Sequence, residues 1–245
     1  MKHRIILVLG SLIVVSLACD LPEIPSLSEV TLTGSGNVVT REEPITGFDK
    51  VDISDSFNIV INQAEEYKVV VRVDDNLVEH LQVEKQGSTL KIGLKPDVSI
   101  VSNATLEAEI TMPELAGIDL SGASDAQISG FKSTQSVTVD LSGSSSLVGD
   151  IESGDASFNL SGSSDATLTG SGGNLTLDAS GSSDVDLSAF PVADANFNVG
   201  GASTAIVNPS GVLNVAASGA SDVYYLGSPS LGNIDASGAS TVEPQ

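Results

Sequence analysis

A short phrase built on glycine and serine recurs through the second half of the chain and constrains its fold more than any other feature. DLSGASD begins at residue 119, DLSGSSS at 140, NLSGSSD at 159 and DASGSSD at 178. Aligned on the glycine of this phrase, seven units follow one another at intervals of 21, 19, 19, 20, 18 and 19 residues. A period this regular is typical of a repeat architecture, in which each unit packs only against its neighbours.

Apolar and polar side chains alternate around each of these glycines. Around Gly162, for example, Phe158, Leu160 and Ala166 are apolar, whereas Asn159 and Asp165 are polar. A period of two indicates β-strands with one inward face, and no unit of this length can bury that face alone. We therefore predict an all-β, single-stranded parallel β-helix (a β-solenoid), right-handed, with about 19 residues per coil and coils about 4.8 Å apart.

The glycine and the serine two residues after it are expected to form the corner of each coil. Glycine lets the backbone turn and approach the next coil closely, because it has no Cβ. The serine is small enough to point inward, where its hydroxyl can bond a neighbouring coil. The predicted corner residues are Gly122, Ser124, Gly143, Ser145, Gly162, Ser164, Gly181, Ser183, Gly201, Ser203, Gly219, Ser221, Gly238 and Ser240.

The segment before the repeats has a weaker form of the same pattern. VDISDSF (51–57) repeats the residues that lead up to Gly122, with Asp55 in the place of the glycine. We therefore assign 37–115 to an irregular N-terminal part of the solenoid. Residues 116–245 form its regular part, with seven SGxS repeats.

The N-terminus is typical of an exported protein. Three basic residues precede an apolar run from Ile5 to Ala18, which is too short for the roughly 20 residues that span a bilayer. Residues 1–18 therefore read as a signal peptide. SLACD (16–20) resembles a bacterial lipobox, although Ser16 and Leu17 stand in reversed order.

We accordingly expect lipidation of Cys19, the only cysteine, with an ordinary signal peptide as the alternative. Residues 19–36 then serve as lipid anchor and flexible tether. This predicts a lipoprotein held at the membrane of the cell envelope and facing outward.

Charge and composition narrow the possible partners. The formal net charge of −22 repels nucleic acid and anionic surfaces. The remaining partners are the membrane through the lipid anchor, a carbohydrate, an envelope protein or a second copy of the chain. Self-association is expected because ASGASTVEPQ shows no capping helix, and uncovered strand edges favour pairing.

No residue pattern indicates catalysis. His80 is the only histidine after the leader and lies outside the repeats, so a Ser-His-Asp arrangement is not expected. A polysaccharide lyase or hydrolase is the enzymatic alternative, but Lys132 is the only basic residue of the repeats, and their aspartates lie in regular rows.

These aspartate rows raise the question of metal binding. Stacked carboxylates about 5 Å apart repel one another by roughly 0.8 kcal/mol in water. Calcium bridging between coils would relieve this repulsion, and its candidate ligands are Asp119, Asp140, Asp165 and Asp184. Interruption of the rows by Asn159 and Asn198 favours a solvated acidic face instead, so no cofactor is expected.

Three sequence features together resemble a known family. GSGNVVTREEPITGFDKVDIS (34–54), VDDNLVEHLQVEKQGSTLKIGL (73–94) and the SGxS repeats resemble the bacterial head GIN domain family, also called auto-transporter adhesins. The resemblance implies an exported, β-helical, often lipid-anchored domain and supplies no catalytic residues. We therefore expect a non-enzymatic, adhesin-like binding or structural module of the cell surface, with a passive envelope spacer or stress-related component as a further alternative.

Overall fold

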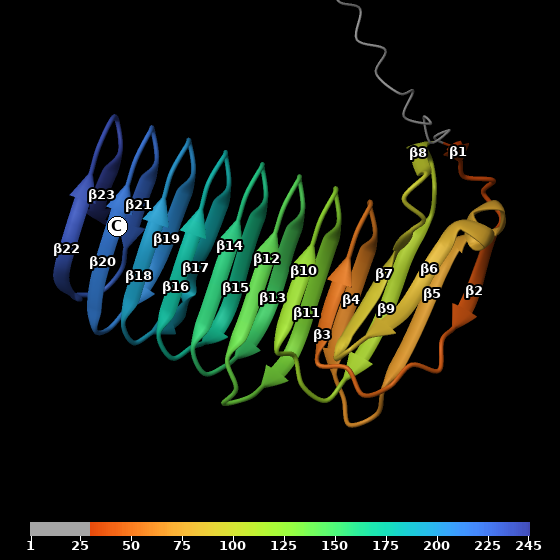
Figure 1. Cartoon of the computed structure of the whole chain (residues 1–245). Helices are drawn as coiled ribbons and strands as arrows, with labels where there is room; N and C mark the ends of the chain where they lie inside the picture. Colours follow the sequence, from red (N-terminus) through yellow and green to blue (C-terminus); the bar gives the residue numbers. More distant parts are fainter. Residues whose placement is uncertain (1–29) are drawn as a thin grey trace, which may run out of the picture.

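The computed structural model describes residues 30–245, which form a rod of stacked β-coils (Figure 1). Two long sheets face each other along the rod. In spatial order, the ten-stranded sheet contains β22 (Ser230–Ala236), β20 (Val212–Ala217), β18 (Ala195–Val199), β16 (Leu175–Ala179), β14 (Ala156–Leu160), β12 (Val137–Leu141), β10 (Gly117–Leu120), β3 (Lys50–Ile53), β7 (Thr89–Leu94) and β6 (Leu81–Gln86). The eleven-stranded sheet contains β2 (Val38–Glu42), β5 (Lys68–Asp74), β9 (Leu106–Met112), β4 (Asn58–Gln63), β11 (Asp125–Lys132), β13 (Ser146–Glu152), β15 (Asp165–Ser171), β17 (Asp184–Val192), β19 (Thr204–Pro209), β21 (Asp222–Tyr225) and β23 (Thr241–Pro244).

The repeats form a parallel β-solenoid, as the sequence predicts. Each coil from β10–β11 to β22–β23 contributes one strand to each sheet, and equivalent residues pair in parallel with the next coil. Asn159, for example, lies between Asp140 and Asp178 in the ten-stranded sheet. The apolar rows point into the space between the sheets, where Phe158 and Leu177 are fully buried.

The repeat glycines align in one column at the corner between the sheets. All seven have φ between 74° and 82°, the left-handed region that favours glycine. The column is also a hydrogen-bond ladder, because the Ser163 N–H donates to the Gly143 carbonyl at 2.8 Å and equivalent bonds join the other coils. A Cβ on Gly162 would overlap that same carbonyl.

The corner serines are buried, and their hydroxyls bond their own corner more often than the neighbouring coil. In the repeats from Ser124 to Ser221 these side chains are at most 1% exposed. Their hydroxyls donate mainly within their own corner, as Ser164 Oγ does to the Ser161 carbonyl at 2.9 Å. Ser221 Oγ also reaches the Val199 carbonyl of the neighbouring coil at 3.0 Å. The tight turn brings the hydroxyl closer to its own backbone than to the next coil.

The N-terminal segment supplies a coil that stacks directly on the first repeat. β3 and β4 pair in parallel with β10 and β11, so that Asp52 lies beside Asp119. Asp55 occupies the glycine position with φ 73°, and its carboxylate accepts a hydrogen bond from the Leu94 N–H at 2.6 Å. The sequence echo between 51–57 and the repeats therefore reflects a true coil.

Residues between β4 and β10 close the end of the rod rather than adding coils in sequence order. β7 and β9 pair in parallel with β3 and β4 on the side opposite the repeats. β6 and β5 then add antiparallel strands, and a 3-10 helix, η1 (Asp75–His80), follows β5. β2, which precedes β3 in the chain, pairs antiparallel with β5 as the last strand of its sheet. This antiparallel cap ends both sheets (Figure 1).

The boundary assigned to the tether needs correction. Residues 30–33 form β1 (Val30–Thr33), which pairs in parallel with β8 (Val98–Ser102) in a separate two-stranded sheet. Val30 and Leu32 pack against the core, so this part of 19–36 belongs to the folded body. The signal peptide, Cys19 and the tether up to residue 29 lie outside the described residues.

The two N-terminal segments that carry the family resemblance contact each other. Asn76 Nδ2 donates to the Thr33 carbonyl at 2.9 Å, and the Ser35 N–H donates to Asn76 Oδ1 at 3.1 Å. Ser35 Oγ also bonds Asp75. These contacts hold β1 to the cap, which gives the GSGN and VDDN segments a structural role.

Candidate functional site

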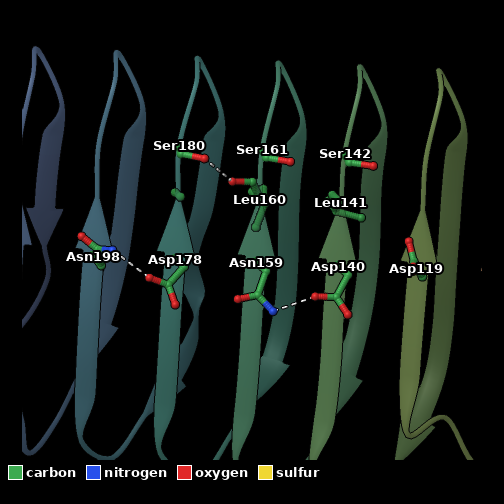
Figure 2. A pocket seen from close by; sticks show the side chains of 11 residues that line it. Asp119, Asp140, Leu141, Ser142, Asn159, Leu160, Ser161, Asp178, Ser180 and Asn198 are labelled. Atoms are coloured by element: carbon green, nitrogen blue, oxygen red, sulfur yellow. Dashed lines mark hydrogen bonds between the residues drawn. The ribbon is translucent and has the colours of Figure 1, made fainter.

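The outer face of the ten-stranded sheet carries the row of aspartates predicted from the repeats. Asp119, Asp140, Asn159, Asp178 and Asn198 lie one per coil along a shallow groove of about 350 Å³ (Figure 2). Four of these side chains form two hydrogen-bonded pairs, because Asn159 Nδ2 donates to Asp140 at 2.6 Å and Asn198 Nδ2 to Asp178 at 3.0 Å. The amides thus offset the repulsion that an unbroken carboxylate row would carry.

Asp119 is the member of this row with carboxylates on both sides. It lies between Asp52 and Asp140, and Lys91 Nζ pairs with Asp52 at 2.7 Å. Burial raises the pKa of the Asp119 carboxyl above its ordinary value of 3.8, and the charges of Asp52 and Asp140 raise it further, while Lys91 opposes them.

The raised pKa predicts the pH dependence of an Asp119→Asn variant. The folded protein binds the Asp119 proton more tightly than the unfolded chain, so this group lowers stability at neutral pH. The loss is relieved as the pH falls through the raised pKa. Asp119 is only partly desolvated by its neighbours and remains accessible to solvent, so we expect the variant to gain less than about 1 kcal/mol of unfolding free energy at neutral pH. Acidification should stabilise the variant less than the wild type.

Urea unfolding across the acidic and neutral range measures this difference. Asp178→Asn is the matched control, because Asp178 has amides on both sides and accepts a hydrogen bond from Asn198. The control variant should show no increase in the free energy of unfolding at neutral pH. Identical pH profiles for wild type and Asp119→Asn would contradict the assignment.

The four calcium candidates are stacked as the sequence predicts. Asp119 lies beside Asp140 in the ten-stranded sheet and Asp165 beside Asp184 in the eleven-stranded sheet. Within residues 30–245, however, no cluster of three or more acidic, cysteine or histidine side chains could hold a metal ion. The solvated acidic face without bound calcium stays the prediction, calcium bridging is its alternative, and melting curves in millimolar calcium and in chelator distinguish the two. We expect equal melting temperatures.

A second groove lies on the outer face of the eleven-stranded sheet, where the cap meets the repeats. This junction groove has a volume of about 640 Å³ and crosses β9, β4, β11 and β13. Two rows of outward side chains cross these strands in register. One row is Glu109, Val60, Gln127 and Val148, and the other is Glu107, Asn58, Asp125 and Ser146. Val60 and Val148 are 41% and 48% exposed, so the groove has an apolar floor open to solvent.

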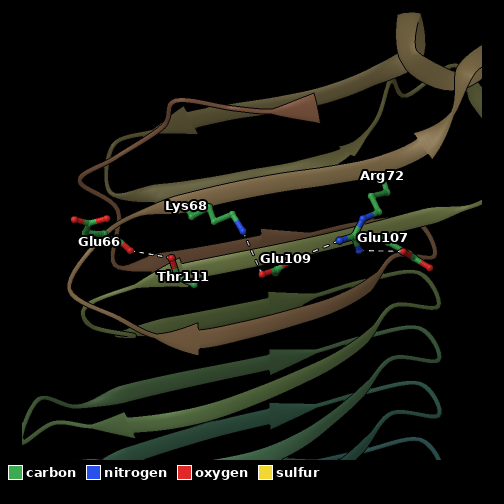
Figure 3. Close-up of polar contacts among 6 residues, drawn as sticks. All are labelled: Glu66, Lys68, Arg72, Glu107, Glu109 and Thr111. Atoms are coloured by element: carbon green, nitrogen blue, oxygen red, sulfur yellow. Dashed lines mark hydrogen bonds and ion pairs between the residues drawn. The ribbon is translucent and has the colours of Figure 1, made fainter. Parts of the chain in front are cut away.

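Loosely paired charges of β5 and β9 lie at the junction groove, where Arg72, Glu107 and Glu109 are among its lining residues (Figure 3). Arg72 of β5 lies 3.5 Å from Glu107 and 3.6 Å from Glu109, and Lys68 lies 3.4 Å from Glu109. The Arg72 and Glu107 side chains are 45% and 47% exposed. Exposed pairs at such distances contribute little to stability, so these groups can rearrange around a ligand at small cost.

The two grooves differ in how completely their polar side chains are hydrogen-bonded or paired with one another. Along the ten-stranded sheet, amides and carboxylates bond each other at short distances. The junction groove combines loose ion pairs with exposed valines. Such groups add little to the stability of the fold, but they are suited to contact a ligand. We therefore take the junction groove as the candidate binding site.

Sequence reasoning missed this site. The only local signal is that Val60 and Val148 are apolar at outward positions of the strand pattern. Arg72 reaches the groove through the antiparallel pairing of β5 with β9, which no spacing in the sequence indicates.

The residues weighed for catalysis occupy ordinary surface positions. His80 Nε2 lies 3.5 Å from Glu79, and Lys132 Nζ pairs with Glu152 at 2.7 Å with both side chains well exposed. Neither residue lines the junction groove. Their surroundings give no reason to assign them a chemical step.

The sequence matches the family model described as "Putative auto-transporter adhesin, head GIN domain" over residues 47–229. The chain belongs to this family. The residues that match the head GIN domain model include the junction groove and the repeats up to β21. No curated protein is significantly similar to the chain.

Solved structures share the fold at low sequence identity. A "putative adhesin" from Bacteroides fragilis has a TM-score of 0.79 at 20% identity, covering 87% of this chain and 100% of its own. A "putative lipid binding protein" from Parabacteroides distasonis has a TM-score of 0.72 at 18% identity, covering 88% and 99%. A "putative adhesin" from the same species has a TM-score of 0.65 at 19% identity, covering 88% and 100%. At this identity the likeness shows the fold alone.

Among residues 30–245, no helix has the length and apolar character needed to cross a membrane.

Proposed function

We propose that this head GIN domain protein is a non-enzymatic, adhesin-like binding module displayed at the cell surface. The junction groove is the observation that carries this proposal, because it joins an exposed apolar floor to loosely paired charges. The family description supports the same role.

In this proposal, a lipid on Cys19 holds the protein at the outer side of the envelope membrane. The basic head, short apolar run and SLACD segment of the leader support such processing. The rod then positions the junction groove outside the membrane, within reach of external ligands. Self-association through the outer edges of β22 and β23 stays a prediction, and light scattering on the full chain tests it.

Cell adhesion tests the proposed function. The full chain is displayed on a non-adherent host, and attachment to extracellular polysaccharide and to other cells is counted. We expect attachment to fall to the level of the empty host with a Val60→Ser, Val148→Ser double variant, because it replaces the apolar floor with hydroxyls.

Val212→Ser is the matched control, since Val212 is also exposed but belongs to β20 of the ten-stranded sheet. This variant should attach like the wild type. Full attachment by the double variant, at equal surface expression, would overturn the assignment of the groove.

A further inference from the structure

We propose that the ligand of the junction groove is an uncharged glycan, bound as an extended oligosaccharide across the strands. This inference rests on the proposed function and names the chemical class of its ligand. It follows from three properties of the groove: its strands are paired on both sides, its side chains carry amides, carboxylates and a guanidinium that can bond hydroxyls, and its floor is apolar and small.

The strand pairing argues against a peptide ligand that adds to the sheet. β4 is paired on both sides, with β9 and β11, and β11 is paired with β4 and β13. Their backbone N–H and C=O groups are therefore occupied, so β-augmentation has no edge to use at the groove. Recognition must come from side chains that project outward from a complete sheet.

Those side chains carry the groups that bind hydroxyls. Asn58 and Gln127 present amides, Asp125 and Glu107 present carboxylates, and Arg72 presents a guanidinium. Amides both donate and accept, carboxylates accept, and the guanidinium donates up to five hydrogen bonds. A sugar hydroxyl donates and accepts at once, so it can bond every one of these groups.

The charge of the groove disfavours ionic ligands. Three carboxylates, from Glu107, Glu109 and Asp125, line the groove together with one cation, Arg72, while Lys68 pairs with Glu109 from outside the lining. A polyanion meets this local excess of negative charge and the net charge of −22 of the whole chain. A polycation competes with Arg72 and Lys68 for two of the three carboxylates, although these loose pairs oppose it only weakly. An uncharged ligand avoids both penalties.

The apolar floor of the groove determines the length of ligand that fits and the affinity that is expected. Val60 and Val148 lie two strand steps apart, on either side of Gln127, which is about 10 Å at the usual spacing of strands. Apolar C–H faces of successive sugar rings can rest on these two side chains. Among residues 30–245, no aromatic side chain lines the groove, so we expect each site to bind weakly, with a Kd on the order of millimolar. Many copies on one cell surface would then act together.

Calorimetric titration of the full chain in detergent micelles tests the ligand class. The probes are an uncharged set (dextran, mannan and cello-oligosaccharides), an anionic set (oligogalacturonates) and a cationic set (chitosan oligosaccharides). We expect binding by at least one uncharged glycan and weaker binding by both charged sets. The Val60→Ser, Val148→Ser variant should bind about tenfold more weakly, as should Arg72→Gln, while Val212→Ser binds like the wild type.

The outcomes separate this inference from the proposed function. Absence of binding by every uncharged probe, or tighter binding of a charged set through the groove, overturns the glycan assignment. If cell attachment still depends on Val60 and Val148 in that case, the proposed function stands with another ligand. Glycan binding that the groove variants leave unchanged overturns the site itself. A peptide ligand would appear as attachment that protease treatment of the target surface abolishes.

Discussion

Gly162→Ala is expected to destabilise the protein by about 2–5 kcal/mol. Its φ of 79° costs a non-glycine residue roughly 1–2 kcal/mol. The new Cβ would also overlap the Gly143 carbonyl, and forcing the two coils apart adds about 1–3 kcal/mol. That carbonyl accepts the Ser163 N–H, so the overlap also disturbs the corner ladder. Urea unfolding of the purified full chain measures the change.

Gly87→Ala separates the two contributions. Gly87 also has a positive φ, 64°, but no atom lies within 4 Å of the position its Cβ would take. This variant keeps the conformational cost without the steric one, so we expect a loss of only about 1–2 kcal/mol. Equal losses at the two positions would show that close stacking of the corners contributes nothing.

Phe158→Ala is expected to cost about 3–5 kcal/mol, because the ring is fully buried in the middle of the rod. Phe158 lies between Val139 and Leu177 in the stacked row, and its ring centroid is 6.3 Å from that of Phe190. Truncation leaves a cavity that parallel strands on both sides keep open. The rigid pairing prevents the neighbouring coils from closing it.

Val148→Ala is the control for this second variant. Val148 belongs to the same repeat region but is 48% exposed on the outer face, so its truncation should change stability by less than about 0.5 kcal/mol. Chemical unfolding of both variants gives the comparison. A loss at Phe158 no larger than that at Val148 would mean that the space between the sheets is not a packed core.

The sequence alone is sufficient to predict the structure of the regular half of the fold. The period near 19 residues, the inward apolar rows and the glycine of each corner follow from the alternation and spacing, because every repeat meets the same neighbours. The coil at 51–57 was recognisable for the same reason, despite Asp55 in place of glycine. A local pattern specifies the structure wherever contacts repeat at a constant sequence separation.

The position of that coil and the binding site were decided by tertiary structure. β3 and β4 stack on β10 and β11, while the intervening strands fold to the far side, where β7 and β9 stay parallel and β5 and β6 reverse direction. The folding of these cap strands brings Arg72, Glu107 and Val60 together in the groove. Their separations in the sequence follow no period. The repeat pattern encodes contacts between neighbouring coils. The groove arises where that regularity ends, so its residues come together through long-range pairing that no local pattern records.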